Sequence, residues 1–212
     1  MIVDIIIKFV KDRKAILLVL SYIISALGYG VINNIDSKSY SLATSFDSKI
    51  PLIKYFVIPY YSWYLLIAFS FIYVYIKSQD EFYDFVTCMT ITMLTALLIY
   101  ICFQTTVIRP EIIGDDIFSN LLRNIYKADK PVNCCPSLHV SITLVFSIWI
   151  NRVSENKYLK RGVFFLGTLI ILSTLFIKQH VVIDVFIAFI QVFIVKEIVY
   201  LVKERSFIKE LR

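Results

Sequence analysis

The sequence predicts an all-α fold: a polytopic membrane protein whose single domain, residues 1–212, is a six-transmembrane-helix bundle with an N-terminal interfacial helix. Two observations carry this prediction. First, 58% of the 212 residues are hydrophobic and only 18% are charged, and a soluble domain of this length folds around one modest core that cannot bury so much apolar surface. Second, six separate apolar stretches approach the length of about 20 residues that a helix needs to cross a bilayer.

The first segment, Met1–Lys14, has the pattern of a helix lying in the membrane interface. Charged side chains recur at helical spacing on one face and aliphatic or aromatic side chains cover the other. A helical lead-in to the first span explains the same pattern equally well. The segment carries Asp4 and Asp12 and has no small-residue cleavage site, so we do not expect a cleaved signal peptide.

The six predicted spans are Ala15–Ile35, Tyr55–Ile76, Phe85–Ile108, Pro136–Ile150, Gly162–Ile177 and His180–Val202. If the N-terminus is cytoplasmic, the segments on the cytoplasmic side carry more Lys and Arg than those on the other side. The positive-inside rule therefore places both termini in the cytoplasm of a multi-pass cell-membrane protein.

The net charge of +6 fits contact with anionic lipid headgroups. We find no basic patch interleaved with aromatic residues, so the predicted partner is the lipid bilayer and not a nucleic acid. The four Cys show no zinc-ligand spacing and are expected to be small packing residues. The adjacent carboxylates Asp115 and Asp116 lack further ligands and are interpreted as a solvated loop. We expect neither a metal nor another cofactor.

The reactive side chains gather at one end of the predicted bundle. His139 begins the fourth span, His180 begins the sixth, and Arg109 ends the third. An even number of crossings separates these positions, so all three lie at one depth, on the extracytoplasmic side. Ionisable groups that face one another at a span boundary are functional by default.

His180 and Asp184 are four residues apart and share a face of the predicted sixth helix. A carboxylate there can accept the Nδ1 proton of His180, which leaves Nε2 as a nucleophile or base. The structural alternative is an ion pair between Asp184 and Lys178.

The segment Pro136–His139 is typical of a helix start, where free N–H groups bind phosphate. The Ser137 hydroxyl adds a donor, although a simple helix cap explains it equally well. Arg109 offers a planar fork that matches phosphate oxygens, and Lys178 offers a point charge. Two His can then divide the work of phosphoryl transfer: one attacks phosphorus and the other protonates the leaving alkoxide.

At these positions the chain resembles the type 2 phosphatidic acid phosphatase superfamily. Three motifs in residues 109–184 carry the resemblance: Arg109-Pro110, Pro136-Ser137-Leu138-His139, and His180 followed by Asp184. The resemblance implies a metal-independent six-helix membrane enzyme. It implies that His180 is the nucleophile that forms a phosphohistidine, that Asp184 orients it and that His139 is the acid. It also implies phosphate-binding roles for Arg109, Ser137 and Lys178.

Two positions depart from the usual motifs. Cys102 stands where the first motif has a Lys, and Ser173-Thr174 stands where the third opens Ser-Arg. Lys178 can replace one of the missing cations. Two further patterns resemble bacterial members related to the sphingolipid phosphotransferases: Lys178-Gln179-His180, and Ile50-Pro51 followed by Pro59, Tyr60 and Trp63.

The predicted function is a membrane lipid phosphatase whose substrate is a lipid phosphate or pyrophosphate, such as phosphatidic acid, phosphatidylglycerol phosphate or a polyprenyl pyrophosphate. Two alternatives stay open. One is a lipid phosphotransferase that uses an alcohol as acceptor in place of water. The other is a non-catalytic membrane protein of the same fold, an interpretation that the two missing cations favour.

Overall fold

The computed structural model describes residues 2–35 and 37–210; at residue 2 and residues 205–210 it describes the backbone alone. Residues 1, 36, 211 and 212 of the predicted domain lie outside the described part. The described chain folds into helices and two short strands. The α-helices are α1 (Ile2–Lys11), α2 (Arg13–Ile32), α3 (Val57–Lys77), α4 (Gln79–Cys102), α5 (Ile117–Ala128), α6 (Leu138–Val153), α7 (Lys157–Phe176) and α8 (Val182–Glu210). The remaining elements are the 3-10 turns η1 (Asp47–Lys49) and η2 (Lys54–Phe56) and the strands β1 (Tyr40–Ser41) and β2 (Thr105–Thr106).

The prediction of an all-α protein with several apolar helices is confirmed. Five helical segments are long and apolar enough to cross a membrane: Arg13–Ile32, Lys54–Lys77, Gln79–Cys102, Lys157–Phe176 and Val182–Glu204. The remaining predicted span, the fourth (Pro136–Ile150), corresponds to α6, an apolar helix of 16 residues. The N-terminal helix is present as α1, separated from α2 at Asp12, whose carboxylate accepts the Ala15 N–H at 2.9 Å and caps α2.

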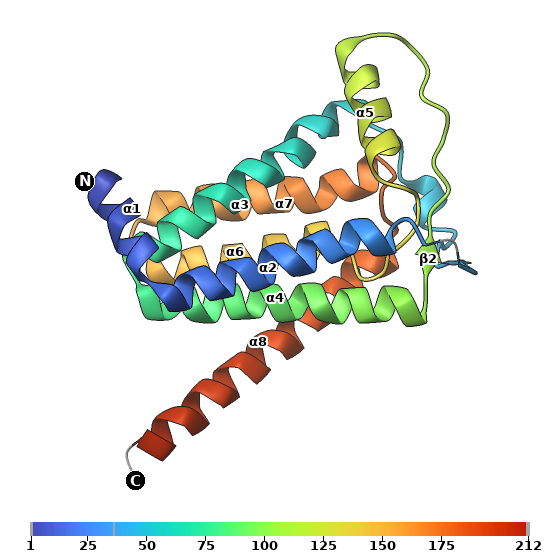
Figure 1. Ribbon diagram of the computed structural model, residues 1–212. Helices are drawn as coiled ribbons and strands as arrows, with labels where there is room; N and C mark the ends of the chain where they lie inside the picture. Colours follow the sequence, from blue (N-terminus) through green and yellow to red (C-terminus); the bar gives the residue numbers. More distant parts are fainter. Residues whose placement is uncertain (1, 36, 211–212) are drawn as a thin grey trace.

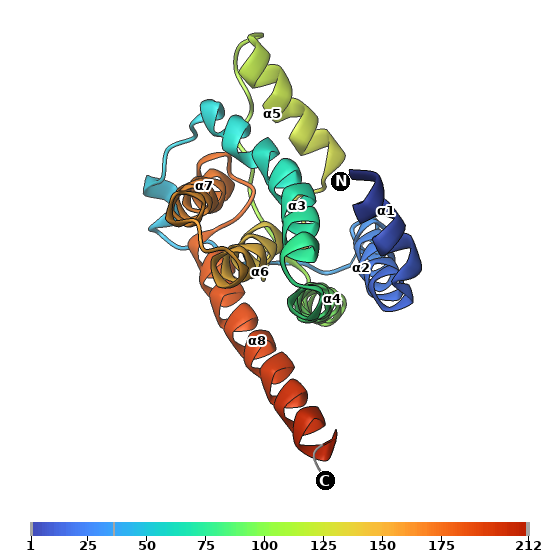
Figure 2. The same ribbon diagram turned by 90° about the vertical axis from the view of Figure 1, so that its left-hand side faces the viewer.

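The helices α2, α3, α4, α6, α7 and α8 alternate in direction, and α8 leaves the bundle at an angle (Figures 1 and 2). The short helix α6 is at the centre, because it packs against α3, α4, α7 and α8. Its Ile142, Phe146 and Trp149 side chains are fully buried. The longer helices around α6 give it an apolar environment along its length. The helix nearest the middle of the bundle is also the shortest of the six.

Helix α4 begins earlier and ends earlier than the predicted third span. The Ser78 side chain accepts the Glu81 N–H at 3.3 Å, and acidic residues in the first turn favour a helix start there. At the other end, the chain leaves the helix after Cys102 to pair with β1, with Thr105 opposite Tyr40 in a parallel register. The prediction that Arg109 ends a span is therefore wrong: Arg109 lies in the loop after β2.

The helices on either side of His180 also differ from the predicted spans. Asn156 caps α7, so this helix starts five residues before the predicted Gly162. Helix α8 starts at Val182, and His180 therefore lies in the link between α7 and α8 and not inside the sixth span. The reason is local: Lys178 has a left-handed φ of 55°, which ends α7 and turns the chain toward the next helix.

Helix α5 was missed by the sequence prediction. Asp116 caps it by accepting N–H groups from Phe118 (3.1 Å) and Ser119 (3.2 Å), so the two adjacent carboxylates are not simply a solvated loop. Lys54 pairs with Asp116 at 2.5 Å, and this ammonium, together with the Ser119 hydroxyl, holds the pKa of the Asp116 carboxyl well below its usual value. The amphipathic α5 packs on η2 and α3 at one end of the bundle (Figure 1).

A buried polar network fixes α6 and α8 against α4. The Gln191 amide accepts the Ser141 hydroxyl at 2.7 Å and donates to the Thr92 carbonyl at 2.9 Å and to the Thr95 hydroxyl at 2.8 Å. Such bonds between apolar helices align them against sliding. Because Ser141 follows His139 by two residues and Gln191 lies on the helix that follows His180, the network sets the relative position of the two His.

Candidate active site

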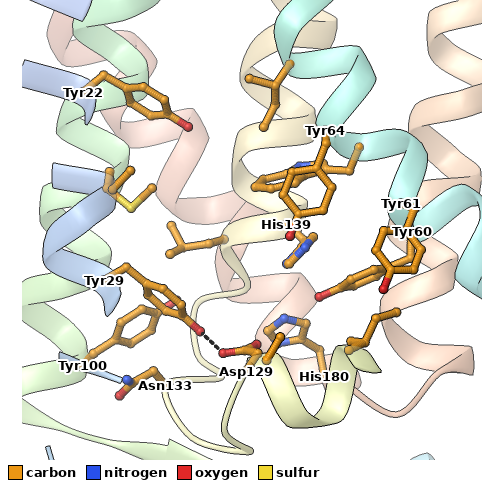
Figure 3. Close-up of a pocket in the computed structure, with 17 residues that line it drawn as sticks. Tyr22, Tyr29, Tyr60, Tyr61, Tyr64, Tyr100, Asp129, Asn133, His139 and His180 are labelled. Atoms are coloured by element: carbon orange, nitrogen blue, oxygen red, sulfur yellow. Dashed lines mark hydrogen bonds between the residues drawn. The ribbon is translucent and has the colours of Figure 1, made fainter. Parts of the chain in front are cut away.

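A cavity of about 470 Å³ opens at the end of the bundle where α5 lies. It is enclosed by α2, α3, α4, α5 and the start of α6, and seven of its 17 lining residues are Tyr or Trp (Figure 3). The aromatic side chains are Tyr22, Tyr29, Tyr60, Tyr61, Trp63, Tyr64 and Tyr100. The lining also holds two imidazoles and one carboxylate, those of His139, His180 and Asp129, so chemistry in this cavity centres on them.

The two His of the chain meet in this cavity. His139 comes from the first turn of α6, and His180 comes from the link before α8. Their ring centroids are 6.3 Å apart, and both rings face the same space (Figure 3). This separation leaves the two imidazoles close enough to act on one small group placed between them.

His139 is held by two aromatic rings of α3. Its ring centroid lies 4.3 Å from that of Tyr60 and 4.3 Å from that of Trp63. Its Nε2 atom is buried and has no hydrogen-bond partner among the described residues. Because a buried polar atom without a partner is costly, this nitrogen is a candidate for contact with a bound ligand.

His180 is held in one tautomer by its neighbours. Its Nδ1 lies 3.0 Å from the Cys134 carbonyl oxygen and 3.4 Å from Asp184 Oδ2. A carbonyl oxygen only accepts, so a hydrogen bond to it assigns the proton to Nδ1 and leaves a lone pair on Nε2. The expected effect on the tautomer is thus present, but the nearer acceptor is the Cys134 carbonyl and not the predicted carboxylate.

Asp184 connects the start of α8 to the start of α6. Its Oδ2 accepts the Val181 N–H at 2.9 Å, and its backbone carbonyl accepts the Ser137 N–H at 3.2 Å. The prediction that His180 and Asp184 share a helix face is wrong, since His180 precedes the helix. The two side chains approach because the capping turn at Val181 folds His180 back over the first turn of α8.

Ser137 has the capping role that the sequence left open. It is fully buried, and its hydroxyl oxygen accepts the Val140 N–H at 3.4 Å at the start of α6. The structure brings Ser137 close to Asp184 through the backbone but does not place it in the lining of the cavity. Its effect on the site is to fix where α6, and therefore His139, begins.

Arg109 contacts the backbone at the end of α5. Its guanidinium donates to the carbonyls of Asp129 (2.6 Å), Tyr126 (3.3 Å) and Lys130 (3.4 Å) and to the Gln179 side chain. It also lies over the Tyr126 ring, 4.7 Å from its centroid. Arg109 does not line the cavity, and its fork binds a helix C-terminus in this structure instead of facing the two His.

Arg109→Lys tests this structural role, because lysine keeps the charge and loses the fork. Each charge-assisted bond contributes about 1.5–3 kcal/mol when buried, and Arg109 is partly exposed. We expect a loss of roughly 2 kcal/mol for Arg109→Lys and a similar loss for Arg109→Ala, seen as a lower midpoint of thermal unfolding in detergent. Lys127→Ala, an exposed change on α5, is the control. A lysine variant as stable as the native protein would contradict the role of the fork.

Lys178 faces a second, smaller cavity. Its ammonium donates to the Asp47 carbonyl at 3.0 Å and to the Ile50 carbonyl, so it fixes the loop around η1. It lines a cavity of about 350 Å³ that also reaches His180. The predicted alternative, an ion pair of Lys178 with Asp184, is not the arrangement observed.

Asp47 is a site residue that the sequence did not indicate. Its side chain accepts the Val182 N–H at 2.8 Å and the Thr44 N–H at 2.8 Å. Burial raises the pKa of the Asp47 carboxyl, but these hydrogen bonds outweigh burial and bring the pKa below its usual value. A carboxylate that stays ionised at the start of α8 complements the positive end of the helix and steadies the link that carries His180.

The two departures from the usual motifs lie apart from the cavity. Cys102 is exposed at the end of α4. The backbone carbonyl of Thr174 accepts the N–H groups of Gln179 (3.0 Å) and His180 (3.1 Å).

The sequence analysis also missed Asp129, which reaches the cavity from the end of α5, a helix that was not predicted. The sequence pattern around Asp129 is a carboxylate that follows an amphipathic stretch, and this pattern is too common to indicate a site residue.

The three motifs thus meet at one end of the bundle, although their side chains have different surroundings. No protein-family model, no curated protein and no solved structure matches the chain. Membership of the type 2 phosphatidic acid phosphatase superfamily therefore stays a prediction that rests on the three motifs.

Proposed function

We propose that the protein transfers the phosphoryl group of a membrane lipid phosphate ester through a covalent intermediate on His180. The observation that carries this proposal is the pair of imidazoles facing one cavity, 6.3 Å apart between ring centroids. One has its Nδ1 proton directed to a carbonyl oxygen, and the other has a buried Nε2 without a partner within the described chain. A nucleophile needs a free ring nitrogen and a general acid needs a proton to donate, and two imidazoles that face one cavity can divide these roles.

In the first step, His180 Nε2 attacks phosphorus and the bond from phosphorus to the lipid oxygen breaks. The leaving alkoxide takes the proton of a protonated His139. In the second step, neutral His139 takes a proton from water, and the hydroxide attacks the phosphohistidine and releases His180. The start of α6 at the cavity supplies the positive end of a helix, which stabilises the phosphate charge. No step requires a metal or another cofactor.

In this proposal the chain spans the cell membrane six times, with α6 as the fourth span. Both termini are cytoplasmic, and the cavity faces the extracytoplasmic side. Support comes from the alternating direction of the apolar helices and from the large apolar side chains exposed on α7 and α8, such as Phe164, Phe165 and Phe193. These side chains suit contact with lipid tails. A membrane phosphatase that acts on phosphatidic acid, phosphatidylglycerol phosphate or a polyprenyl pyrophosphate requires such contact.

One feature of the cavity favours the phosphotransferase alternative. The Asp129 carboxylate accepts the Tyr29 hydroxyl at 2.7 Å and the Asn33 amide at 2.9 Å, and it lines the cavity among aromatic rings. A carboxylate surrounded by aromatic faces suits an organic cation, because the ring quadrupoles and the negative charge attract it together. This arrangement favours a diester lipid with a cationic headgroup, whose phosphoryl-headgroup unit passes from His180 to an alcohol.

A lipid panel separates the two functions. Purified protein in chelator is incubated with phosphatidic acid or with a lipid that carries a phosphocholine headgroup, with and without an added alcohol. The phosphatase releases inorganic phosphate from the first lipid. The phosphotransferase moves phosphocholine from the second lipid to the alcohol. The panel also includes phosphatidylglycerol phosphate and a polyprenyl pyrophosphate. If none of these lipids reacts and no phosphohistidine forms, the non-catalytic alternative is correct and the proposed activity is wrong.

Asp129→Asn tests the cationic headgroup. Loss of one charge-assisted contact corresponds to about 1.5–3 kcal/mol, so we expect KM for the phosphocholine lipid to rise on the order of 10- to 100-fold. The KM for phosphatidic acid should stay the same or fall. Glu111→Gln, which removes an exposed loop carboxylate, is the matched control. An equal effect of Asp129→Asn on both lipids would contradict a role in charge recognition.

A further inference from the structure

Two further ligand side chains, Cys134 and Asp184, lie close to the His180 imidazole. The Cys134 thiol, the His180 imidazole and the Asp184 carboxylate have ligand atoms that all lie within 4.8 Å of one another. Cys134 is 3% exposed and the Asp184 side chain is 1% exposed. The cluster therefore lies below the cavity surface, behind the ring that the proposed reaction uses.

The carboxylate of this cluster has an oxygen without a partner. Asp184 Oδ2 accepts the Val181 N–H, but Oδ1 is buried and has no hydrogen-bond partner in the described part of the chain. The ion pair that Asp184 forms is with His180, which carries a charge only when protonated. A buried carboxylate with an unused oxygen and no permanent positive partner favours the entry of a cation.

We propose that Cys134, His180 and Asp184 bind one divalent ion of the zinc class on the Nδ1 side of His180. The ligand set balances the charge, because one thiolate and one carboxylate neutralise a divalent ion and the imidazole is neutral. In tetrahedral coordination, bonds of about 2.0–2.3 Å place ligand atoms about 3.3–3.6 Å apart. His180 Nδ1 and Asp184 Oδ2 already have such a separation, 3.4 Å, whereas the Cys134 sulfur, which lies within 4.8 Å of the other ligand atoms, has to move closer when an ion binds.

The donor types also decide which ions bind. A thiolate and an imidazole favour zinc, cobalt and cadmium ions, whereas magnesium and calcium prefer sets made of oxygen atoms. The spare oxygen of Asp184 or a water molecule completes the coordination. We expect magnesium to leave the site unchanged even at concentrations well above those at which zinc fills it.

Ion binding at this place switches the proposed chemistry off. A neutral imidazole carries one proton, and an ion on Nδ1 takes the position of that proton. The proton moves to Nε2, which then has no lone pair with which to attack phosphorus. The thiol releases its proton to solvent, so each bound ion frees one proton, and binding tightens as the pH rises. This consequence rests on the proposed function, whereas the ion site itself does not.

The binding test uses cobalt(II) alone as the probe, with full-length protein in detergent. The native protein should take up one equivalent and show the visible bands of tetrahedral cobalt together with a thiolate-to-cobalt charge-transfer band. Cys134→Ser should remove the charge-transfer band and weaken cobalt binding. Loss of a residue that only hydrogen-bonds to a ligand costs roughly 10- to 100-fold in metal affinity, and loss of the ligand itself should cost more. Cys88→Ser, a buried cysteine of α4, is the matched control and should leave the spectrum unchanged.

A second measurement on native protein avoids dependence on the folding of the variant. Cadmium-113 bound at the site should give one NMR resonance in the range for a single sulfur ligand. No cobalt uptake, a spectrum unaffected by Cys134→Ser, or a cadmium site without sulfur would overturn the proposal. Inhibition is measured separately: loss of phosphohistidine should follow zinc occupancy and be reversed by chelator. A protein that binds cobalt as described but never forms phosphohistidine would keep the ion site and disprove the proposed function.

Discussion

His180→Ala is expected to abolish turnover on every lipid phosphate ester. Removing a covalent nucleophile leaves no route to the intermediate, and such losses reach the order of 10⁶-fold. The two cavities that reach His180 would remain, so binding of substrate should survive the change. The measurement is acid-quench trapping with lipid labelled at phosphorus: labelled phosphohistidine should form in native protein and be absent from the variant.

His180→Asn is the matched control for folding. The asparagine amide can donate to the Cys134 carbonyl as the Nδ1–H does, at a native distance of 3.0 Å, so the link before α8 should keep its conformation. The variant should be as inactive as His180→Ala while unfolding close to the native temperature. Residual turnover above the background reaction in either variant would show that phosphorus is attacked by a different group.

His139→Ala is expected to have an effect that depends on the leaving group. A lipid alkoxide is strongly basic and needs a proton as it departs, so turnover on lipid should fall on the order of 10²- to 10⁴-fold. A nitrophenolate leaves without a proton. In the first turnover, the same variant should therefore release phenolate from nitrophenyl phosphate at close to the native rate, measured by rapid mixing as a burst of coloured phenolate, if the native protein accepts this substrate. Labelled phosphohistidine should then accumulate in the variant with this substrate, because the second step also uses His139.

The stacking partners of His139 provide the control for this experiment. Tyr60→Phe keeps an aromatic ring against His139, at a native centroid distance of 4.3 Å, and should preserve the dependence on leaving group. Equal losses of the first-turnover rate on lipid and on nitrophenyl phosphate in His139→Ala would show that this residue positions the substrate or the helix and does not donate a proton.

Much of the fold could be predicted from the sequence because apolar runs of sufficient length have few other structures available. The ends of the helices could not, because they depend on single polar contacts. Ser78 starts α4 earlier than hydrophobicity indicates, and Asn156 does the same for α7. The start of α8 depends on the Asp47 carboxylate, which comes from a loop more than a hundred residues earlier. Hydrophobic periodicity carries no information about such a contact.

The candidate site, like the fold, could be predicted from the sequence only in part. The positions of His139 and His180 at span boundaries were enough to bring their rings to one end of the bundle. The roles of Arg109 and Lys178 could not be read in the same way, because their acceptors are backbone carbonyls that only the folded loops bring near. Asp129 escaped notice since helix α5, which carries it to the cavity, begins with a cap from Asp116 that resembles an ordinary acidic loop.

The shortness of α6 has a consequence for the lipid itself. A helix of 16 residues is about 24 Å long, whereas the hydrocarbon core of a bilayer is about 30 Å thick. In the proposed topology, with α6 as a span centred in the bilayer, its first turn and the His139 ring lie about 3 Å inside the edge of the hydrocarbon core, and farther from the phosphates of the headgroups. A lipid phosphate must sink to meet them, or the membrane must thin around the protein. Activity should then increase in bilayers made from lipids with shorter chains, and hydrophobic mismatch becomes a determinant of rate alongside the chemistry of the headgroup.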